Sequence, residues 1–291
     1  MGTKLWGSRS SVKARKRAEW VESRGGSAIG GAGAAVGPCT IVGGGRIGSL
    51  LAGTHPGNKL IGRNDAYDDL PPGPIYVATR NDALDGVVDK CPDERLGDLV
   101  FLQNGYIDEW LKGKGLEKNT QALLFFAVAK LGEEPTDGVT RVNPEGLTAV
   151  TGKHAEDLKA RLEEVGLKCN VLGEDDYAKA MWEKLAWITG YMLVGTAKGM
   201  GSVGETGEKQ DEILSELFDE MFGNVEGIEW DDKEAVKEKL RAYTEVVAHF
   251  PCGVKEFEWR NKVWYGRGLD KHDGLIKECI EAGTFALTLT E

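Results

Sequence analysis

The stretch Cys39-Thr40-Ile41-Val42, followed at once by Gly43-Gly44-Gly45-Arg46-Ile47-Gly48, decides the fold of this chain. It is a short apolar strand that runs into a GxGxxG turn, and the turn opens a helix. In such a turn the first glycine permits the bend, the second lets the backbone approach a pyrophosphate, and the third packs helix on strand. The amides of the helix N-terminus then face the phosphates. We therefore predict a dinucleotide site at Gly43, Gly44, Gly45, Arg46, Ile47 and Gly48, the alternative being a glycine-rich loop without a ligand.

The first 37 residues differ in composition from the rest of the chain. Glycine-rich residues 25–37 have no apolar strand before them and do not match GxGxxG, so we interpret them as a flexible linker. Basic residues lie upstream among serine, alanine and glycine. Residues 1–37 are thus either an organelle-targeting leader or a disordered basic extension, and we expect a cytoplasmic protein unless they are a transit peptide.

Composition excludes several classes of protein. The formal net charge of −11 over 291 residues argues against a nucleic-acid partner. No apolar run reaches the roughly 20 residues that a membrane helix needs. The five cysteines contain no CxxC, which favours a reducing compartment, and the four histidines show no metal-binding spacing, so no metal site is predicted.

Short apolar runs recur along the first part of the chain, separated by helix-length segments. This alternation is typical of a parallel sheet wound with helices. We expect strands at 59–61, 74–79, 98–102, 123–128 and 167–171, a hairpin or two short strands within 140–151, and a helix over 155–165.

Beyond Asp175 the apolar residues recur at helical spacing, as in Leu214, Leu217, Phe218 and Met221. The chain is thus predicted to be α/β, with a Rossmann-type doubly wound sheet followed by an all-helical C-terminal domain. We place the nucleotide-binding domain at 38–178 and the helical substrate domain at 179–291, with the substrate in the cleft between them. The largely apolar helical part is compatible with a homodimer.

Two arginines indicate which dinucleotide binds. Arg63 lies 20 positions after Gly43, at the end of the second predicted strand, where an arginine favours the 2′-phosphate of NADPH. Asp65 is close enough to keep NADH as an alternative, because an acidic residue there accepts from a ribose hydroxyl. Arg80 follows the next strand and is either a second cationic contact to the cofactor or a solvated arginine.

Residues 180–194 are apolar on nearly every helical face, so a buried helix with Glu183 and Lys184 as its charges is expected. The Lys184 ammonium is either extended outward to water or held at a site, where desolvation would lower its pKa toward that of a proton donor. The pair Asn104-Gly105 follows a strand at the sheet edge where nicotinamide is expected, although Asn-Gly is also a common turn. Glu256 and Arg260 predict a solvated ion pair one helical turn apart.

Six segments, in this order, resemble the ketopantoate reductase family over roughly residues 38–270. They are GGGRIGSLLAG at 43–53, LIGRND at 60–65, VATRND at 77–82, LQNG at 102–105, MWEKLAW at 181–187 and KEFEWRN at 255–261. The resemblance implies NADPH-dependent reduction of a 2-oxo acid to a 2-hydroxy acid, with ketopantoate to pantoate in pantothenate biosynthesis as the expected conversion.

The resemblance also implies roles for individual residues. Lys184 would be the general acid, Asn104 would lie beside nicotinamide and substrate, and Glu256 near the lysine and the substrate hydroxyl, with Asn261 as a further substrate contact. Arg63 matches the arginine for the 2′-phosphate, and Arg80 stands where a lysine is usual. Ile188 replaces an asparagine that binds substrate in the family. A reductase of another 2-oxo acid, or a catalytically silent NADP-binding sensor or interaction protein, are therefore the alternatives.

Overall fold

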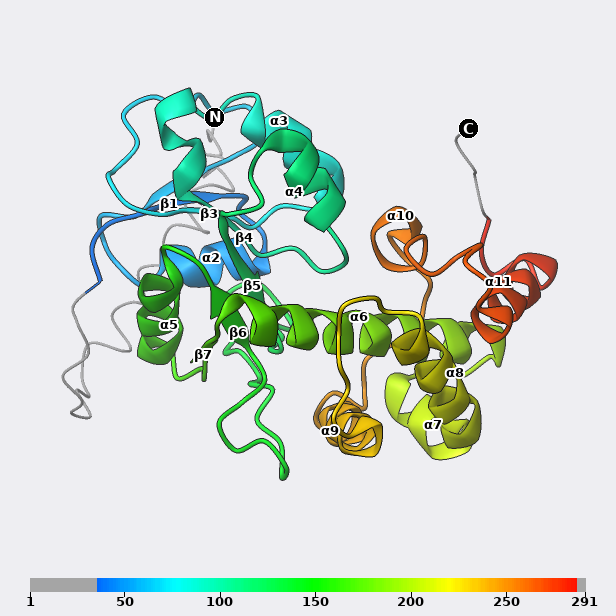
Figure 1. Ribbon diagram of the computed structural model, residues 1–291. Coiled ribbons are helices and arrows are strands. Elements are labelled where there is room, and N and C mark those ends of the chain that lie inside the picture. Colours follow the sequence, from blue (N-terminus) through cyan, green and yellow to red (C-terminus); the bar gives the residue numbers. More distant parts are fainter. Residues whose placement is uncertain (1–35, 287–291) are drawn as a thin grey trace, which may run out of the picture.

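A computed structural model describes residues 36–286 of the protein (Figure 1). Its core is a seven-stranded sheet in the order β2-β1-β3-β4-β5-β6-β7, in which every neighbouring pair is parallel except β5 and β6. The strands are β1 (Thr40–Val42), β2 (Lys59–Ile61), β3 (Ile75–Val77), β4 (Leu99–Phe101), β5 (Thr120–Leu123), β6 (Ala149–Thr151) and β7 (Asn170–Val171).

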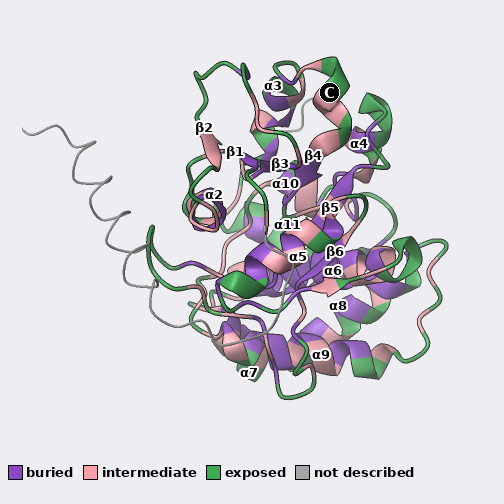
Figure 2. Cartoon of the chain, turned by 90° about the vertical axis from the view of Figure 1, so that its left-hand side faces the viewer, coloured by how far each residue is buried: buried purple, intermediate pink, exposed green. Residues whose placement is uncertain are grey.

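Both faces of the sheet are covered, because its central strands are apolar at successive positions and strand side chains alternate between faces. One set of alternate residues packs against α2 (Arg46–Ala52) and α5 (Ala155–Glu164); it comprises Ile41, Tyr76 and Val100. The other set packs against α3 (Leu84–Val88) and α4 (Asp108–Lys114); it includes Val42, Val77 and Phe101. Figure 2 shows these central strands as buried and the outward surfaces of the helices as exposed.

The strand expected at 123–128 is displaced, since β5 ends at Leu123. The apolar run that follows is shared between two cores: Phe125 packs into the helical part, while Phe126 packs into the sheet cluster. The Phe125 amide donates to the Thr148 hydroxyl at 3.0 Å instead of to a strand. The stretch 140–151 likewise gives one strand, β6, rather than a hairpin or two strands.

The second part of the described chain is helical, as predicted. Its central element is α6 (Glu174–Ala197), a helix of 24 residues that runs from the sheet into the helical part (Figure 1). Around it lie α7 (Val203–Lys209), α8 (Asp211–Gly223), α9 (Lys233–Val246), α10 (Phe257–Arg260) and α11 (Asp270–Glu281). The domain boundary predicted at residue 178 falls within α6 and stays a prediction, and most of the predicted extension at 1–37 lies outside the described residues.

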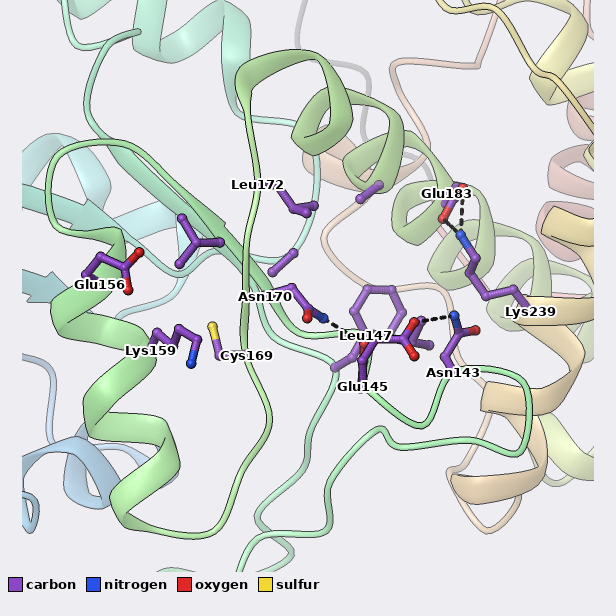
Figure 3. A pocket seen from close by; sticks show the side chains of 15 residues that line it. Asn143, Glu145, Leu147, Glu156, Lys159, Cys169, Asn170, Leu172, Glu183 and Lys239 are labelled. Carbon is purple, nitrogen blue, oxygen red and sulfur yellow. Dashed lines mark hydrogen bonds and ion pairs between the residues drawn. The ribbon is translucent and has the colours of Figure 1, made fainter. Parts of the chain in front are cut away.

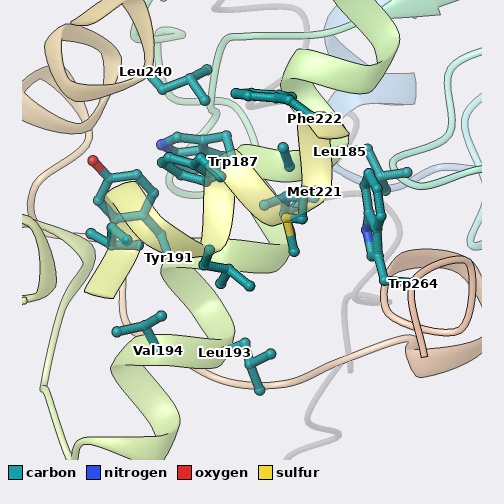
Figure 4. Close-up of a cluster of buried hydrophobic side chains, with 14 of the residues drawn as sticks. Leu185, Trp187, Tyr191, Leu193, Val194, Met221, Phe222, Leu240 and Trp264 are labelled. Atoms are coloured by element: carbon teal, nitrogen blue, oxygen red, sulfur yellow. The ribbon is translucent and has the colours of Figure 1, made fainter. Parts of the chain in front are cut away.

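Helix α6 is apolar on almost every face because other helices surround it. Leu185, Trp187 and Tyr191 from α6 meet Met221 and Phe222 from α8 in one cluster (Figure 4). Trp187 also packs edge-on to Tyr243, with ring centroids 4.7 Å apart, and its indole N–H donates to the Thr244 hydroxyl at 2.8 Å. Among residues 36–286, no helix is long and apolar enough to cross a membrane.

Candidate functional site

The glycine turn after β1 is packed so tightly that side chains are excluded from two of its positions. Gly43 has a φ of +106°, and a Cβ there would lie 2.6 Å from the Ala78 carbonyl oxygen. A Cβ on Gly48 would lie 1.8 Å from the Gly43 carbonyl oxygen. Gly45, in contrast, has open space where its Cβ would be. The turn therefore fits the pyrophosphate of a dinucleotide, with glycines where the bend and the helix packing require them and an open side toward a ligand.

Arg46 and Ile47 hold the turn in place. The Arg46 guanidinium donates through Nη1 to the carbonyl oxygens of Val128 at 2.9 Å and Ala129 at 3.2 Å, both in the segment after β5. Ile47 packs against the sheet. The Arg46 hydrogen bonds therefore connect the nucleotide turn to the segment that follows β5, which lies about 80 residues further along the chain.

The arginines predicted for the 2′-phosphate are exposed, and they differ in their partners. The Arg63 guanidinium makes no hydrogen bond to a described residue, whereas Arg80 pairs with Asp82 at 3.1 Å. Asp65 is the residue for which NADH remained an alternative cofactor. Its Oδ2 accepts a hydrogen bond from the Gly62 amide at 2.7 Å. One carboxylate oxygen of Asp65 is thus already used by the turn after β2.

Lys184 lies buried on α6, at the carboxyl end of β5. Its ammonium donates to the carbonyl oxygen of Leu124 and lies over the Phe125 ring, 4.6 Å from the centroid. Burial and, to a smaller extent, the nearby Arg260 cation together lower the pKa of Lys184 to about 7. Of the two sequence alternatives, the side chain is held inside the protein rather than extended to water.

The loop after β4 carries Asn104 and is fixed at both ends. Gln103 Nε2 donates to the Val77 carbonyl oxygen at 3.0 Å, which holds the loop at the carboxyl end of β3. The Asn104 carbonyl accepts from Asn81 Nδ2 at 2.9 Å, and the Asn104 side chain is exposed. Gly105 has a φ of +109°, and a Cβ there would lie 2.4 Å from the Trp259 carbonyl oxygen. The loop therefore abuts α10.

Short helix α10 brings Glu256 and Arg260 to the same place. The Arg260 guanidinium donates through Nη2 to the Glu256 carboxylate, and their side chains are 13% and 23% exposed. The solvated ion pair predicted from the sequence is therefore wrong: the pair exists but is largely buried. The reason is tertiary, since the loop after β4 packs on Trp259 and the Thr189 hydroxyl of α6 donates to the Arg260 carbonyl at 2.9 Å.

The structure thus gathers Lys184, Glu256 and the loop bearing Asn104 where α6 and α10 meet the carboxyl ends of β4 and β5. Asn261 is oriented elsewhere: it is buried, and its Oδ1 lies 3.3 Å from His272 Nε2 on α11. Arg260 was not predicted from the sequence to be a site residue. In the sequence Arg260 lies between Phe257 and Trp264, both of which are buried, and this pattern indicates that Arg260 is buried too. The indication is weak, because α10 is too short to show a clear apolar face.

A cavity of about 520 Å³ is lined by residues of α5, β6, β7, α6 and α9 and by Phe125, the ring over which the Lys184 ammonium lies (Figure 3). Part of its polar lining is already paired, with Lys239 bound to Glu183 at 2.8 Å and Asn143 to Glu145 at 2.9 Å. None of the residues predicted for catalysis or cofactor binding lines it. In residues 36–286 there is also no group of three or more His, Cys, Asp or Glu side chains placed to bind a metal.

Comparison with known proteins identifies the architecture. No protein-family model and no curated protein matches the sequence. Among solved structures, a D-mandelate dehydrogenase with NADH and anilino(oxo)acetate has a TM-score of 0.62 at 13% identity, covering 84% of this chain and 98% of its own. A 2-dehydropantoate 2-reductase from Geobacter metallireducens GS-15 has a TM-score of 0.59 at 16% identity, covering 84% and 99%. The chain has the ketopantoate reductase fold.

A dimeric ketopantoate reductase from Staphylococcus aureus gives a TM-score of 0.58 at 17% identity, covering 84% of this chain and 99% of its own. The ketopantoate reductase fold therefore spans nearly the whole length of each of these neighbours. The predicted fold class, a Rossmann-type sheet followed by a helical part, is confirmed. At such identities the likeness concerns the fold, and function has to be argued from the site.

Proposed function

We propose that this protein is an NADPH-dependent reductase of a 2-oxo acid, with ketopantoate to pantoate, the step of pantothenate biosynthesis, as the expected conversion. The observation that carries the proposal is the buried Lys184 ammonium at the carboxyl end of β5, with its pKa lowered to about 7. In an open α/β sheet, ligands bind outside the carboxyl ends of the strands, where the nucleotide turn and Lys184 both lie.

The geometry of the nucleotide turn supports a dinucleotide, and the arginines favour NADPH. Gly43, Gly44, Gly45, Arg46, Ile47 and Gly48 would hold the pyrophosphate. The Arg63 guanidinium, which has no partner in the described part of the chain, would bind the 2′-phosphate, with Arg80 as a second cation. One oxygen of the Asp65 carboxylate accepts from the Gly62 amide, which leaves the other as the acceptor that NADH would use. The neighbouring D-mandelate dehydrogenase is described with NADH, so cofactor preference is a direct test of Arg63.

Lys184 would supply the proton of the reaction. When bound, a nicotinamide cofactor would supply the hydride for the ketone carbon of the substrate. Lys184 donates a proton to the ketone oxygen as negative charge develops there, and a pKa near 7 suits an acid that works at neutral pH. Its ammonium has three N–H donors, so one can stay on the Leu124 carbonyl while another reaches the substrate. Asn104 and Glu256 would position the substrate around this proton donor.

The alternative is a catalytically silent NADP-binding sensor or interaction protein. The apolar side chain of Ile188, one turn after Lys184 and 8% exposed, favours it, because no hydrogen-bonding group stands there. A homodimer is part of the proposal in either case. A cytoplasmic location is likewise proposed, or an organellar one if residues 1–37 are a transit peptide.

The decisive experiment combines calorimetric binding of NADPH and NADH with oxidation of NADPH over a panel of 2-oxo acids that includes ketopantoate. We expect tighter binding of NADPH and turnover of ketopantoate or a related branched oxo acid. Lys184→Ala should abolish turnover and leave NADPH binding intact, while Lys262→Ala, which removes an exposed lysine paired with Glu258, should change neither. Cofactor binding without turnover of any oxo acid would favour the silent protein, and full activity in Lys184→Ala would refute the role of Lys184.

A further inference from the structure

We propose that Arg260 binds the carboxylate of the substrate, and so selects oxo acids over uncharged carbonyl compounds. This inference deepens the proposed function and rests on it for the identity of the ligand. Arg260 would then be a ligand of the substrate as well as the partner of Glu256.

The first support is an unsatisfied donor. Arg260 is 13% exposed, and its Nη2 donates to the Glu256 carboxylate. Its Nε is fully buried and has no hydrogen-bond partner among residues 36–286. A buried donor without a partner is costly, and a donor on a charged group more so. A carboxylate beside the guanidinium would satisfy this N–H, and guanidinium binds carboxylates through two parallel hydrogen bonds.

The second support is position relative to the proton donor. The Thr189 hydroxyl donates to the Arg260 carbonyl and so fixes α10 against α6 close to Lys184. The two cations are near enough that Arg260 lowers the pKa of Lys184. A 2-oxo acid carries its ketone and its carboxylate on adjacent carbons. Neighbouring cations on α6 and α10 match that arrangement, with Lys184 at the ketone oxygen and Arg260 at the carboxylate.

The third support is charge. Lys184, Arg260 and Glu256 together carry one net positive charge when Lys184 is protonated, in a place where burial lowers the pKa of both cations. A monoanionic ligand would neutralise this excess. The α6 residues one turn on either side of Lys184, Met181 and Ile188, are apolar and cannot bind a carboxylate. The Thr189 hydroxyl is already used on the Arg260 carbonyl, which leaves Arg260 as the group suited to the task.

Glu256 fits this assignment as a positioning residue. It has a φ of 50°, an uncommon conformation for a residue other than glycine. Its carboxylate engages Nη2 and thus fixes the plane of the guanidinium. An arginine held in this way loses less conformational freedom when it binds a ligand.

The test measures binding rather than turnover. The probes are anilino(oxo)acetate, which has a carboxylate next to a carbonyl, and its methyl ester, which lacks the charge. Binding is followed by calorimetry with and without NADPH, in the parent protein and in Arg260→Gln, Arg260→Lys and the exposed control Arg267→Gln. We expect the parent and Arg267→Gln to prefer the acid over the ester by at least ~10-fold.

In Arg260→Gln, affinity for the acid should fall by about 100-fold, as expected when one partner of a buried charge pair is removed, with the ester unchanged. Arg260→Lys keeps the charge without the planar fork and should lose about 10-fold. If Arg260→Gln fails to fold, the affinity of Arg260→Lys for the acid and the ester tests the inference instead. Unaltered binding of the acid in both variants would overturn the inference, as would a parent protein that shows no preference for the acid.

The two proposals fail separately. Loss of acid binding in the Arg260 variants, together with no NADPH oxidation by any oxo acid in the parent, would support the carboxylate site and refute the reductase. Turnover that persists in Arg260→Gln with an unchanged KM for the oxo acid would support the reductase and refute Arg260 as its carboxylate ligand.

Discussion

At the scale of single residues, Lys184 is the least expected feature, because an ammonium on an apolar helix opposes folding. Its pKa is lowered from 10.5 to about 7 by burial, so between these pH values the unfolded chain binds more protons than the folded one. Stability therefore rises with pH across this range, and the cost of burying the charge is greatest below pH 7. A residue retained at such a cost is a candidate for function.

Lys184→Met should therefore stabilise the protein. We expect the free energy of unfolding to rise by roughly 4 kcal/mol at pH 6, from the size of the pKa shift, and by much less at pH 10. Urea unfolding at the two pH values measures the effect. Lys262→Met, at an exposed lysine, should change stability little at either pH. An equal gain at both pH values would mean that the charge of Lys184 is not what opposes folding.

Arg63 is expected to decide between the two cofactors. Arg63→Ala should raise the dissociation constant for NADPH by at least ~10-fold, through loss of a charge-assisted contact to phosphate, and leave that for NADH unchanged. Arg80→Ala should have a smaller effect, because its guanidinium is exposed and already paired with Asp82. Calorimetric titration with both cofactors checks this. Equal weakening of NADPH and NADH would place Arg63 away from the 2′-phosphate.

At the scale of elements, the glycine turn offers a matched pair of substitutions. Gly43→Ala puts a side chain on a residue with positive φ and within 2.6 Å of the Ala78 carbonyl oxygen. We therefore expect the free energy of unfolding to fall by at least ~2 kcal/mol, and NADPH binding to be lost. Gly45→Ala has open space and a φ of −70°, and should fold normally. Thermal unfolding and NADPH titration compare them. Equal stability of the two variants would contradict the packing of the turn.

Elements with a strong local pattern could be predicted from the sequence, and those set by tertiary contacts could not. The strand at 59–61 and the helix around Lys184 follow from apolar runs and helical spacing. The run 123–128 was wrongly expected to be one strand because Phe125 and Phe126 pack into different cores, which no local pattern reveals. The burial of the Glu256 and Arg260 pair likewise depends on a loop more than 150 residues away in sequence.

At the scale of the whole molecule, α10 joins the two parts of the protein. It contacts the loop after β4 through the Trp259 carbonyl, to which the Tyr106 amide donates at 2.6 Å, and it contacts α6 through the Arg260 carbonyl. The proposed proton donor, carboxylate ligand and nicotinamide edge therefore come from elements that meet at this one helix. The geometry of the site depends on how the loop and α10 are held together.

Gly105 is the residue at which this junction can be disturbed. Its φ of +109° and the 2.4 Å approach of a Cβ to the Trp259 carbonyl mean that Gly105→Ala must move the loop away from α10. We expect kcat/KM for the oxo acid to fall by at least ~10-fold, since small displacements of a reacting group are costly, while NADPH affinity stays within about twofold.

The matched control is Gly113→Ala, in α4 directly after the same loop. It has open space at its Cβ and should be neutral or slightly stabilising, because alanine favours a helix. Steady-state kinetics and NADPH titration of both variants make the comparison. A Gly105→Ala protein with unchanged kcat/KM would show that the loop is free to separate from α10 without consequence, and the substrate would then have to bind elsewhere than at their junction.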